Sequence, residues 1–295
     1  MADQTHEAPP EVTLDDVRAA REVLRGVSID TPMEESRWLS NLVGGPVLLK
    51  CENLQRTGSF KARGAYVRIA RLSEEERARG VVAASAGNHA QGVALAAQLL
   101  GITSTVFMPE GAPIPKEKAT RGYGADVVFE GRYLEDALVA ARRFAAETGA
   151  VLIHPFDHAD IVAGQGTCGL EIIEHSPDVE TVLVPTGGGG LLAGVAIAVK
   201  AVRPDVRVVG VQAAGAAAYP ESLREGHPVA LASMRTMADG IAVGLPGEIT
   251  FAAVRDHVDD IITVSEESMS RALLALVERA KMVVEPAGAA AVAAM

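Results

Sequence analysis

Apolar residues fall into two kinds of segment along this chain, and each kind predicts a different element. Short runs rich in β-branched residues predict strands, and longer stretches with apolar residues at helical spacing predict helices. The expected strands are residues 81–85, 105–108, 126–129, 150–153, 181–185, 207–212 and 261–264, and the clearest helices are residues 89–100, 133–148 and 191–202. Their alternation predicts an α/β fold in which helices cover both faces of parallel sheets.

Four consecutive glycines at residues 187–190 follow one expected strand and precede an expected helix. Glycine lets backbone N–H groups approach an anion closely, and a helix N-terminus adds partial positive charge. The pattern predicts a phosphate-binding loop, with a flexible connection as the alternative. A dinucleotide is disfavoured because the next expected strand ends in Gln212 rather than an acid, and a nucleoside triphosphate because no Lys-Ser or Lys-Thr pair follows the glycines. A small phosphomonoester on another cofactor fits better.

Lys61 stands at the start of an expected helix among small and aromatic neighbours, with no acidic residue close by in sequence. Desolvation lowers the pKa of an amine and makes it a nucleophile or base. An ordinary surface lysine is the alternative. Combined with a phosphate loop that lacks a nucleotide signature, the lysine points to pyridoxal phosphate, which needs both groups.

Ligands of parallel sheets bind beyond the carboxyl ends of the strands, and three glycine-bearing segments are expected there: residues 85–88, 187–190 and 239–241. The first joins a strand to a helix, where free amides bind a carboxylate such as that of an amino acid. Helix capping by Ser85 or Asn88 is the alternative. His89 alone would more often be structural than catalytic.

Composition limits the partners. The chain has 295 residues and a net charge of −11, which disfavours nucleic acid and acidic membranes and favours a small molecule. Its two cysteines, Cys51 and Cys168, have no metal or disulfide spacing, and Cys51 is expected to be buried. The polar N-terminus is unlike a signal peptide, and no apolar run is long enough to span a bilayer, so a cytoplasmic protein is expected.

Several segments resemble the motifs of one family, in the family's order, over nearly the whole chain after residue 14. They are residues 51–61 (CENLQRTGSFK), 85–91, 164–167, 187–190, 238–240 and 285–289. The chain thereby resembles the serine/threonine dehydratase family, in the tryptophan-synthase-β fold group. This implies a discontinuous large cofactor-binding domain of residues 1–82 and 158–295 and a small substrate-binding domain of residues 83–157. The helical and strand pattern is interrupted near these boundaries, at residues 79–80 and 154–157.

The resemblance also implies a role for each site residue. Lys61 would form a Schiff base with pyridoxal phosphate, Phe60 would pack against the ring, and Asn88 would bond the ring 3-hydroxyl. The phosphate would be held by Gly187, Gly188, Gly189, Gly190 and Leu191, the substrate carboxylate by Ser85, Gly87, Asn88 and His89, and Gly240 and Glu285 would line the cofactor pocket.

The activity implied is dehydration and deamination of L-threonine to 2-oxobutanoate and ammonia, with L-serine to pyruvate as a secondary reaction. Lys61 would remove the α-proton before the β-hydroxyl leaves. Isoleucine biosynthesis or threonine breakdown would be the metabolic setting, and a monovalent cation and a homodimer or homotetramer are family expectations. The alternatives are a serine dehydratase or racemase-type enzyme, a β-replacement enzyme, and an inactive amino-acid-binding form.

Two departures from the racemase branch favour dehydration. That branch places a second serine where this chain has Ala86, whose methyl group cannot return a proton to the substrate. It also binds a divalent metal through carboxylates after the strand that here ends at Gln212, and residues 213–218 contain none, so no such metal site is expected.

The C-terminal end differs from the family pattern as well. Related catalytic domains continue to a Ser/Thr-Gly-Gly-Asn strand whose hydroxyl faces the pyridine nitrogen, whereas this sequence ends at Met295. The resemblance therefore implies a fold without its final C-terminal strand.

Overall fold

The computed structural model describes residues 9–295, which contain two parallel sheets and one antiparallel pair of short strands. Residues 1–8, on which the expected lack of a signal peptide rests, lie outside the described part. The strands are β1 Met33–Glu35, β2 Leu48–Lys50, β3 Val81–Ala84, β4 Ser104–Met108, β5 Asp126–Phe129, β6 Val151–Leu152, β7 Thr181–Pro185, β8 Arg207–Ala213 and β9 Asp260–Val264. The helices are α1 Leu14–Val23, α2 Arg37–Val43, α3 Lys61–Ala70, α4 Glu74–Arg79, α5 Asn88–Leu100, α6 Ile114–Gly122, α7 Leu134–Thr148, α8 Ala159–His175, α9 Gly190–Val202, α10 Tyr219–Glu225, α11 Glu248–His257, α12 Glu266–Ala275 and α13 Pro286–Ala293, with single turns η1 Glu52–Leu54, η2 Arg56–Gly58, η3 Ala214–Ala216, η4 Asp239–Ile241 and η5 Leu276–Ala280.

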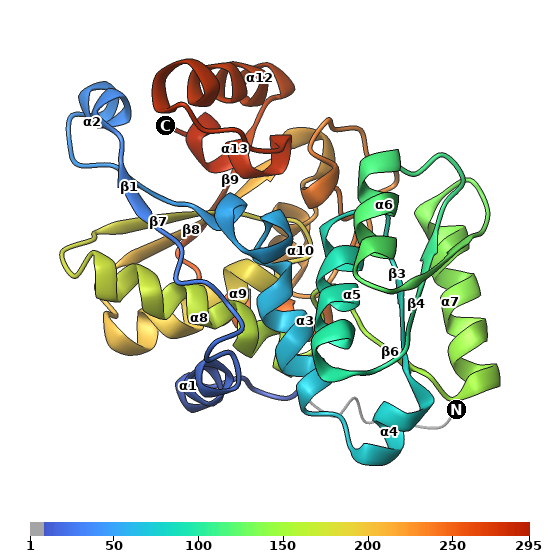
Figure 1. Ribbon diagram of the computed structural model, residues 1–295. Coiled ribbons are helices and arrows are strands. Elements are labelled where there is room, and N and C mark those ends of the chain that lie inside the picture. The colour runs from blue at the N-terminus through green and yellow to red at the C-terminus, as the bar shows by residue number, and fades with distance from the viewer. Residues whose placement is uncertain (1–8) are drawn as a thin grey trace.

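The first sheet has the parallel order β5-β4-β3-β6. Because successive side chains of a strand point to opposite faces, the apolar runs of these strands make both faces of the sheet apolar. Val82 and Phe107 pack with the alanines of α7, while Val106 and Met108 pack with Ala90 and its neighbours on α5. Figure 1 shows α5 and α7 on opposite sides of this sheet.

The second sheet has the parallel order β7-β8-β9. Val182 and Val208 pack into the largest apolar cluster, with residues of α1, α8, α9 and α11. Val211 and Ala213 belong to a separate cluster with Ala287 of α13. Helices therefore cover both faces, and the expected α/β fold with parallel sheets flanked by helices is confirmed.

Helix α3 lies between the two sheets and packs against α5 on one side and α8 on the other (Figure 1). Glycines permit the second contact. A Cβ on Gly64 would lie 2.8 Å from the Ile161 carbonyl oxygen, and one on Gly164 would lie 2.6 Å from the Gly64 Cα. Because α3 begins with Lys61, this backbone contact fixes where the lysine enters the space between the sheets.

The expected strands lie within two residues of the observed ones at either end. The elements that were not expected include the antiparallel strands β1 and β2, the long helix α8 and the helices α2, α4, α6, α10, α11 and α12. Residues 239–241 form the turn η4 rather than following a strand directly, and they lie near the carboxyl end of β7, because Ile241 packs against Gly187. Cys51 and Cys168 are both free and buried.

Candidate active site

Lys61 projects from the start of α3 into a largely desolvated position. Its ammonium donates a hydrogen bond to the Pro155 carbonyl oxygen at 2.7 Å and lies 5.4 Å from the centroid of the Phe60 ring. Burial lowers the pKa of Lys61 to about 8, against the attraction of the Glu285 carboxylate. A substantial fraction of the amine is therefore neutral near pH 8, as a base or nucleophile requires.

The N-terminus of α5 presents backbone donors next to this helix. Gly87 is its N-cap and has no side-chain cap, and Ser85 Oγ accepts a hydrogen bond from the Gly87 N–H at 3.1 Å. Within residues 9–295, the N–H groups of Asn88 and His89 donate to no other group. A cap supplied by Ser85 or Asn88 is therefore not what the structure shows, and the free amides suit a carboxylate.

The ring of His89 has a structural role. Its Nε2 lies 2.8 Å from the Ile153 carbonyl oxygen, which accepts the ring N–H. Burial, with repulsion from Lys61, lowers the pKa of His89 to about 3, so the imidazole is neutral. Of the expected carboxylate-binding groups, His89 can therefore contribute its backbone N–H.

Three of the expected pocket residues meet at the Glu285 carboxylate, whose charge also acts on the Lys61 amine. The Asn88 side-chain amide donates to Glu285 Oε1, and a Cβ on Gly240 would lie 3.1 Å from the same oxygen. Lys116 of α6 also reaches this group, with its ammonium 3.1 Å from Asp239 Oδ2 and 3.8 Å from Glu285 Oε2. Nothing in the sequence indicated Lys116. These contacts join elements of both sheets at one place.

The glycine loop at residues 187–190 connects β7 to α9, and Gly189 has a φ of +94°, which L side chains rarely adopt. The loop is closely packed on one side. A Cβ on Gly187 would lie 2.9 Å from the Ile241 Cα, and one on Gly188 would lie 2.5 Å from the Phe156 ring. Within the described residues, the N–H groups of residues 187–191 donate to no other group. Free donors on a loop without side chains, at a helix N-terminus, suit a phosphate.

The segment from His154 to Asp157 connects this loop to Lys61. Pro155 accepts the lysine hydrogen bond, and Phe156 packs against Gly188. The Asp157 carboxylate accepts from the backbone N–H groups of residues 248–250 at 2.9–3.2 Å and so caps α11. The sequence marked this segment only as an interruption of the pattern, because a carbonyl acceptor and an aromatic contact have no residue-type signature.

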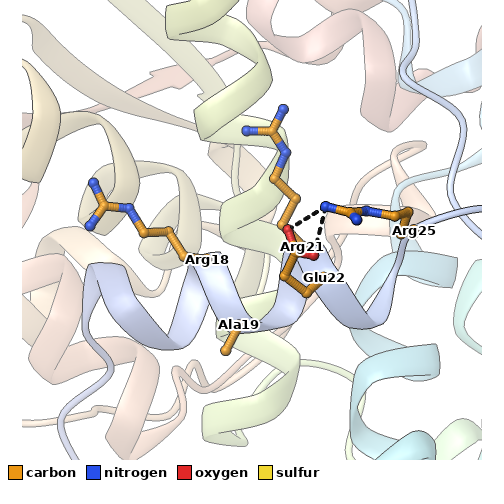
Figure 2. Close-up of a pocket in the computed structure, with 5 residues that line it drawn as sticks. All are labelled: Arg18, Ala19, Arg21, Glu22 and Arg25. Atoms are coloured by element: carbon orange, nitrogen blue, oxygen red, sulfur yellow. Dashed lines mark hydrogen bonds and ion pairs between the residues drawn. The ribbon is translucent and has the colours of Figure 1, made fainter.

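A hollow of about 580 Å³ lies against α1 and is lined by Arg18, Ala19, Arg21, Glu22 and Arg25 (Figure 2). Its arginines form ion pairs: Arg18 with Asp15, Arg21 with Glu174 and Arg25 with Glu22. No expected site residue lines this hollow.

Comparison with known proteins shows the family of the chain. A family model described as pyridoxal-phosphate dependent enzyme matches residues 25–295. The chain belongs to this family. It is 52% identical to an L-threonine ammonia-lyase of Thermotoga maritima, over 96% of this chain and 71% of that protein, and 44% identical to the catabolic L-threonine dehydratase TdcB of Escherichia coli K12, over 99% and 88%. The solved structures include a threonine deaminase from T.th. (TM-score 0.91, 45% identity, 96% of this chain and 92% of that one) and maize serine racemase (TM-score 0.93, 38% identity, 97% and 86%).

The residues present fit this cofactor. The side-chain-free loop with unused N–H donors suits the phosphate, and the lysine with a lowered pKa suits the aldehyde. Pyridoxal phosphate and the tryptophan-synthase-β-like fold, both expected from the resemblance, are confirmed. Within residues 9–295, no helix is long and apolar enough to cross a membrane, and no three His, Cys, Asp or Glu side chains are grouped as metal ligands.

The lowered pKa of Lys61 predicts a pH-dependent stability for the cofactor-free enzyme. Because the pKa falls from 10.5 to about 8, keeping the amine charged in the folded protein costs about 3 kcal/mol. This cost is complete below pH 8, disappears as the pH rises from 8 to 10.5, and is absent above 10.5. Lys61→Met should therefore raise the free energy of unfolding by about 3 kcal/mol at pH 7 and by much less at pH 10, measured by urea unfolding.

The exposed Lys118 of α6 provides the control, because Lys118→Met removes a lysine without opening a buried site. If the difference in unfolding free energy between Lys61→Met and the wild type stayed constant between pH 7 and pH 10, the Lys61 amine would not be desolvated.

Proposed function

We propose that the chain is an L-threonine ammonia-lyase that converts L-threonine to 2-oxobutanoate and ammonia, with L-serine as a secondary substrate. The observation that carries the proposal is the buried Lys61 amine, with a pKa of about 8, beside the free N–H groups at the start of α5. This pairs a base with a carboxylate site. The names of the relatives, L-threonine ammonia-lyase and L-threonine dehydratase, support the substrate.

Each group of residues has a separate task. Residues 187–191 would hold the cofactor phosphate through their N–H groups, and Phe60, Asn88, Gly240 and Glu285 would line the pocket of its ring. Ser85, Gly87, Asn88 and His89 bind the substrate carboxylate at the start of α5. Bound pyridoxal phosphate supplies an electrophilic aldehyde and a ring that stabilises negative charge at the substrate α-carbon.

Lys61 acts on the substrate as the base. Once substrate occupies the site, the neutral Lys61 amine accepts the α-proton at Nζ. The Pro155 carbonyl oxygen is positioned to accept a hydrogen bond from the resulting ammonium. Burial keeps water away from the amine and keeps its pKa close to the working pH. Loss of the α-proton leads to departure of the β-hydroxyl, which both threonine and serine carry.

Racemisation is the second candidate, because serine racemases are among the structural neighbours. It requires a proton donor on the face of the α-carbon opposite Lys61. The turn between β3 and α5 has Ala86 where a second serine would supply that donor, and a methyl group has no proton to give. We therefore place elimination ahead of racemisation.

The same proposal includes the wider setting. Residues 83–157 form the small substrate-binding domain, and residues 1–82 and 158–295 form the large domain. The enzyme is a cytoplasmic homo-oligomer, acts in isoleucine synthesis or threonine breakdown, and takes a monovalent cation.

The purified enzyme, saturated with pyridoxal phosphate, is expected to release 2-oxobutanoate from L-threonine faster than pyruvate from L-serine. Keto acid would be quantified over time, and D-serine by chiral chromatography. Threonine binding without keto acid would contradict the lyase and support an amino-acid-binding role, and D-serine forming faster than pyruvate would favour the racemase.

A further inference from the structure

Two buried hydroxyl groups converge on one carbonyl oxygen of the glycine loop. Tyr219 Oη donates to the Gly188 oxygen at 3.2 Å, and Thr250 Oγ1 donates to it at 2.7 Å. Both side chains are fully buried, at 0% exposure. They come from α10 and α11, far from the loop in sequence, and no expected site residue lies on either helix.

We infer that Tyr219 and Thr250 are positioning residues that fix the Gly188–Gly189 peptide so that its N–H faces the cofactor phosphate. This rests on the proposed role of the loop as the phosphate site. A trans peptide is planar, and its C=O and N–H point in opposite directions. Holding the Gly188 oxygen against the two hydroxyls therefore turns the Gly189 N–H to the other side of the loop.

The conformation of Gly189 requires such support. Its φ of +94° is one of many that a glycine can adopt, so the free chain has little preference for it. The loop rests directly on the two side chains, because a Cβ on Gly189 would lie 1.9 Å from Tyr219 Oη and 3.2 Å from Thr250 Cβ. The hydroxyls thus select one peptide orientation from several that glycines would otherwise populate.

Both hydroxyls are themselves held in place. Thr250 lies in the first turn of α11, and its N–H donates to Asp157 at 3.2 Å. Its Oγ1 accepts from the Gly247 N–H at 3.2 Å. The Tyr219 N–H donates to Gln212 Oε1 at 3.0 Å, and burial raises the pKa of the Tyr219 phenol, which therefore stays a donor. A prepared donor loop loses less entropy on binding an anion than a mobile one.

The test compares two ligands that differ only in the phosphate. The cofactor-free enzyme is titrated with pyridoxal phosphate and with pyridoxal, by equilibrium dialysis. Removing both hydroxyls with Tyr219→Phe and Thr250→Val is expected to weaken pyridoxal phosphate binding by about tenfold and leave pyridoxal binding unchanged, since each lost neutral hydrogen bond has a modest effect. Thr250→Ser alone keeps a hydroxyl at this position and should bind pyridoxal phosphate with wild-type affinity.

Two further variants separate the possible failures. Thr120→Val removes a buried hydroxyl that donates to the Lys116 carbonyl oxygen, away from the loop, and should leave both affinities unchanged. Gly188→Ala places a Cβ 2.5 Å from the Phe156 ring and should abolish the preference for the phosphorylated ligand. Should Gly188→Ala lose this preference while the hydroxyl variants keep it, the inference is overturned and the phosphate site stands. If the hydroxyl variants lost the same affinity for pyridoxal phosphate and for pyridoxal, their role would be structural and the inference would also be overturned. If the wild-type enzyme did not prefer pyridoxal phosphate to pyridoxal, the phosphate site itself would be overturned.

Discussion

Lys61→Ala is expected to slow keto-acid release from L-threonine by about 10⁴-fold, because the base and the point of cofactor attachment are lost together. Among residues 9–295, the site offers no replacement close by. The His89 ring is neutral, with a pKa of about 3, and its Nε2 is bonded to the Ile153 carbonyl oxygen. Lys116 is held by Asp239 and Glu285. Initial rates and the visible absorption of the bound cofactor would both be measured, and the Schiff-base band should be absent.

Lys118→Ala, on the exposed side of α6, is the matched control and should keep both the band and the rate. A small primary amine added to the Lys61→Ala enzyme should restore part of the activity, because it returns a proton acceptor to the vacated space. If Lys61→Ala kept its absorption band, the cofactor would be attached to another lysine and the site would have to be reassigned.

The elements of the fold could largely be predicted from the sequence, because a buried parallel strand has to be apolar on both faces. Residues 126–129 and 181–185 match β5 and β7 at both ends. The strands β1 and β2 were missed, since each has three residues and β1 reads Met-Glu-Glu, with two exposed acids. Pairing between such short strands depends on what packs around them rather than on their own residues.

The site divides along similar lines. Lys61 and the glycine loop could be predicted because their chemistry demands particular residue types. Pro155, Tyr219 and Thr250 could not, because they act through contacts between segments far apart in sequence. The resemblance supplied Asn88, Gly240 and Glu285, and the structure brings these three together. It also places Lys116 beside them, which no motif contained.

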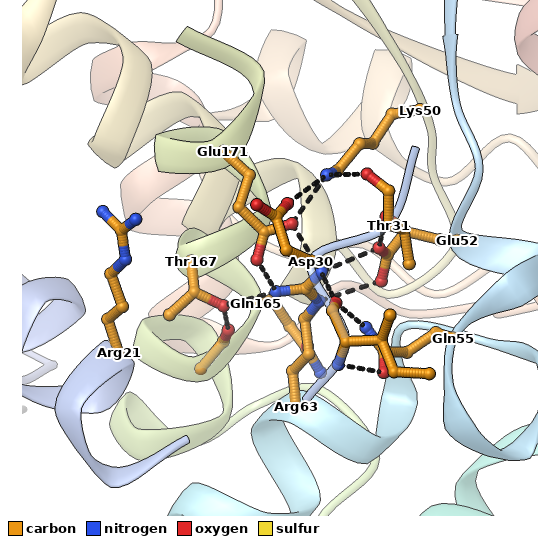
Figure 3. A network of polar contacts seen from close by, with 12 residues as sticks. Arg21, Asp30, Thr31, Lys50, Glu52, Gln55, Arg63, Gln165, Thr167 and Glu171 are labelled. Carbon is orange, nitrogen blue, oxygen red and sulfur yellow. Dashed lines mark hydrogen bonds and ion pairs between the residues drawn. The ribbon is translucent and has the colours of Figure 1, made fainter. Parts of the chain in front are cut away.

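A buried network of charges forms around Arg63, in the same helix as Lys61 (Figure 3). The Arg63 side chain has 0% exposure and lies between Glu52, at 2.8 Å, and Glu171, at 2.5 Å. The Lys50 ammonium lies 2.6 Å from Glu171, and Thr167 Oγ1 accepts from Arg63 at 3.1 Å. The network joins α3, α8 and the segment of β2 and η1.

Arg63→Met is expected to lower the free energy of unfolding by about 3–5 kcal/mol, because it leaves Glu52 and Glu171 with fewer partners while they remain largely shielded from water. Methionine keeps much of the side-chain volume, so the loss measures charge and hydrogen bonding more than a cavity. Urea unfolding of the cofactor-free enzyme at pH 7 would give the value.

Arg25→Met is the matched control, since Arg25 pairs with Glu22 at 2.7 Å but both side chains are exposed, at 77% and 62%. Solvent screens such a pair, and its loss should cost less than about 1 kcal/mol. A similar small loss at Arg63 would show that water reaches the network and replaces the guanidinium. A much larger loss of unfolding free energy at Arg63 than at Arg25 would mean that the buried network holds α3 in position. It would thereby also help to place Lys61, two residues before Arg63.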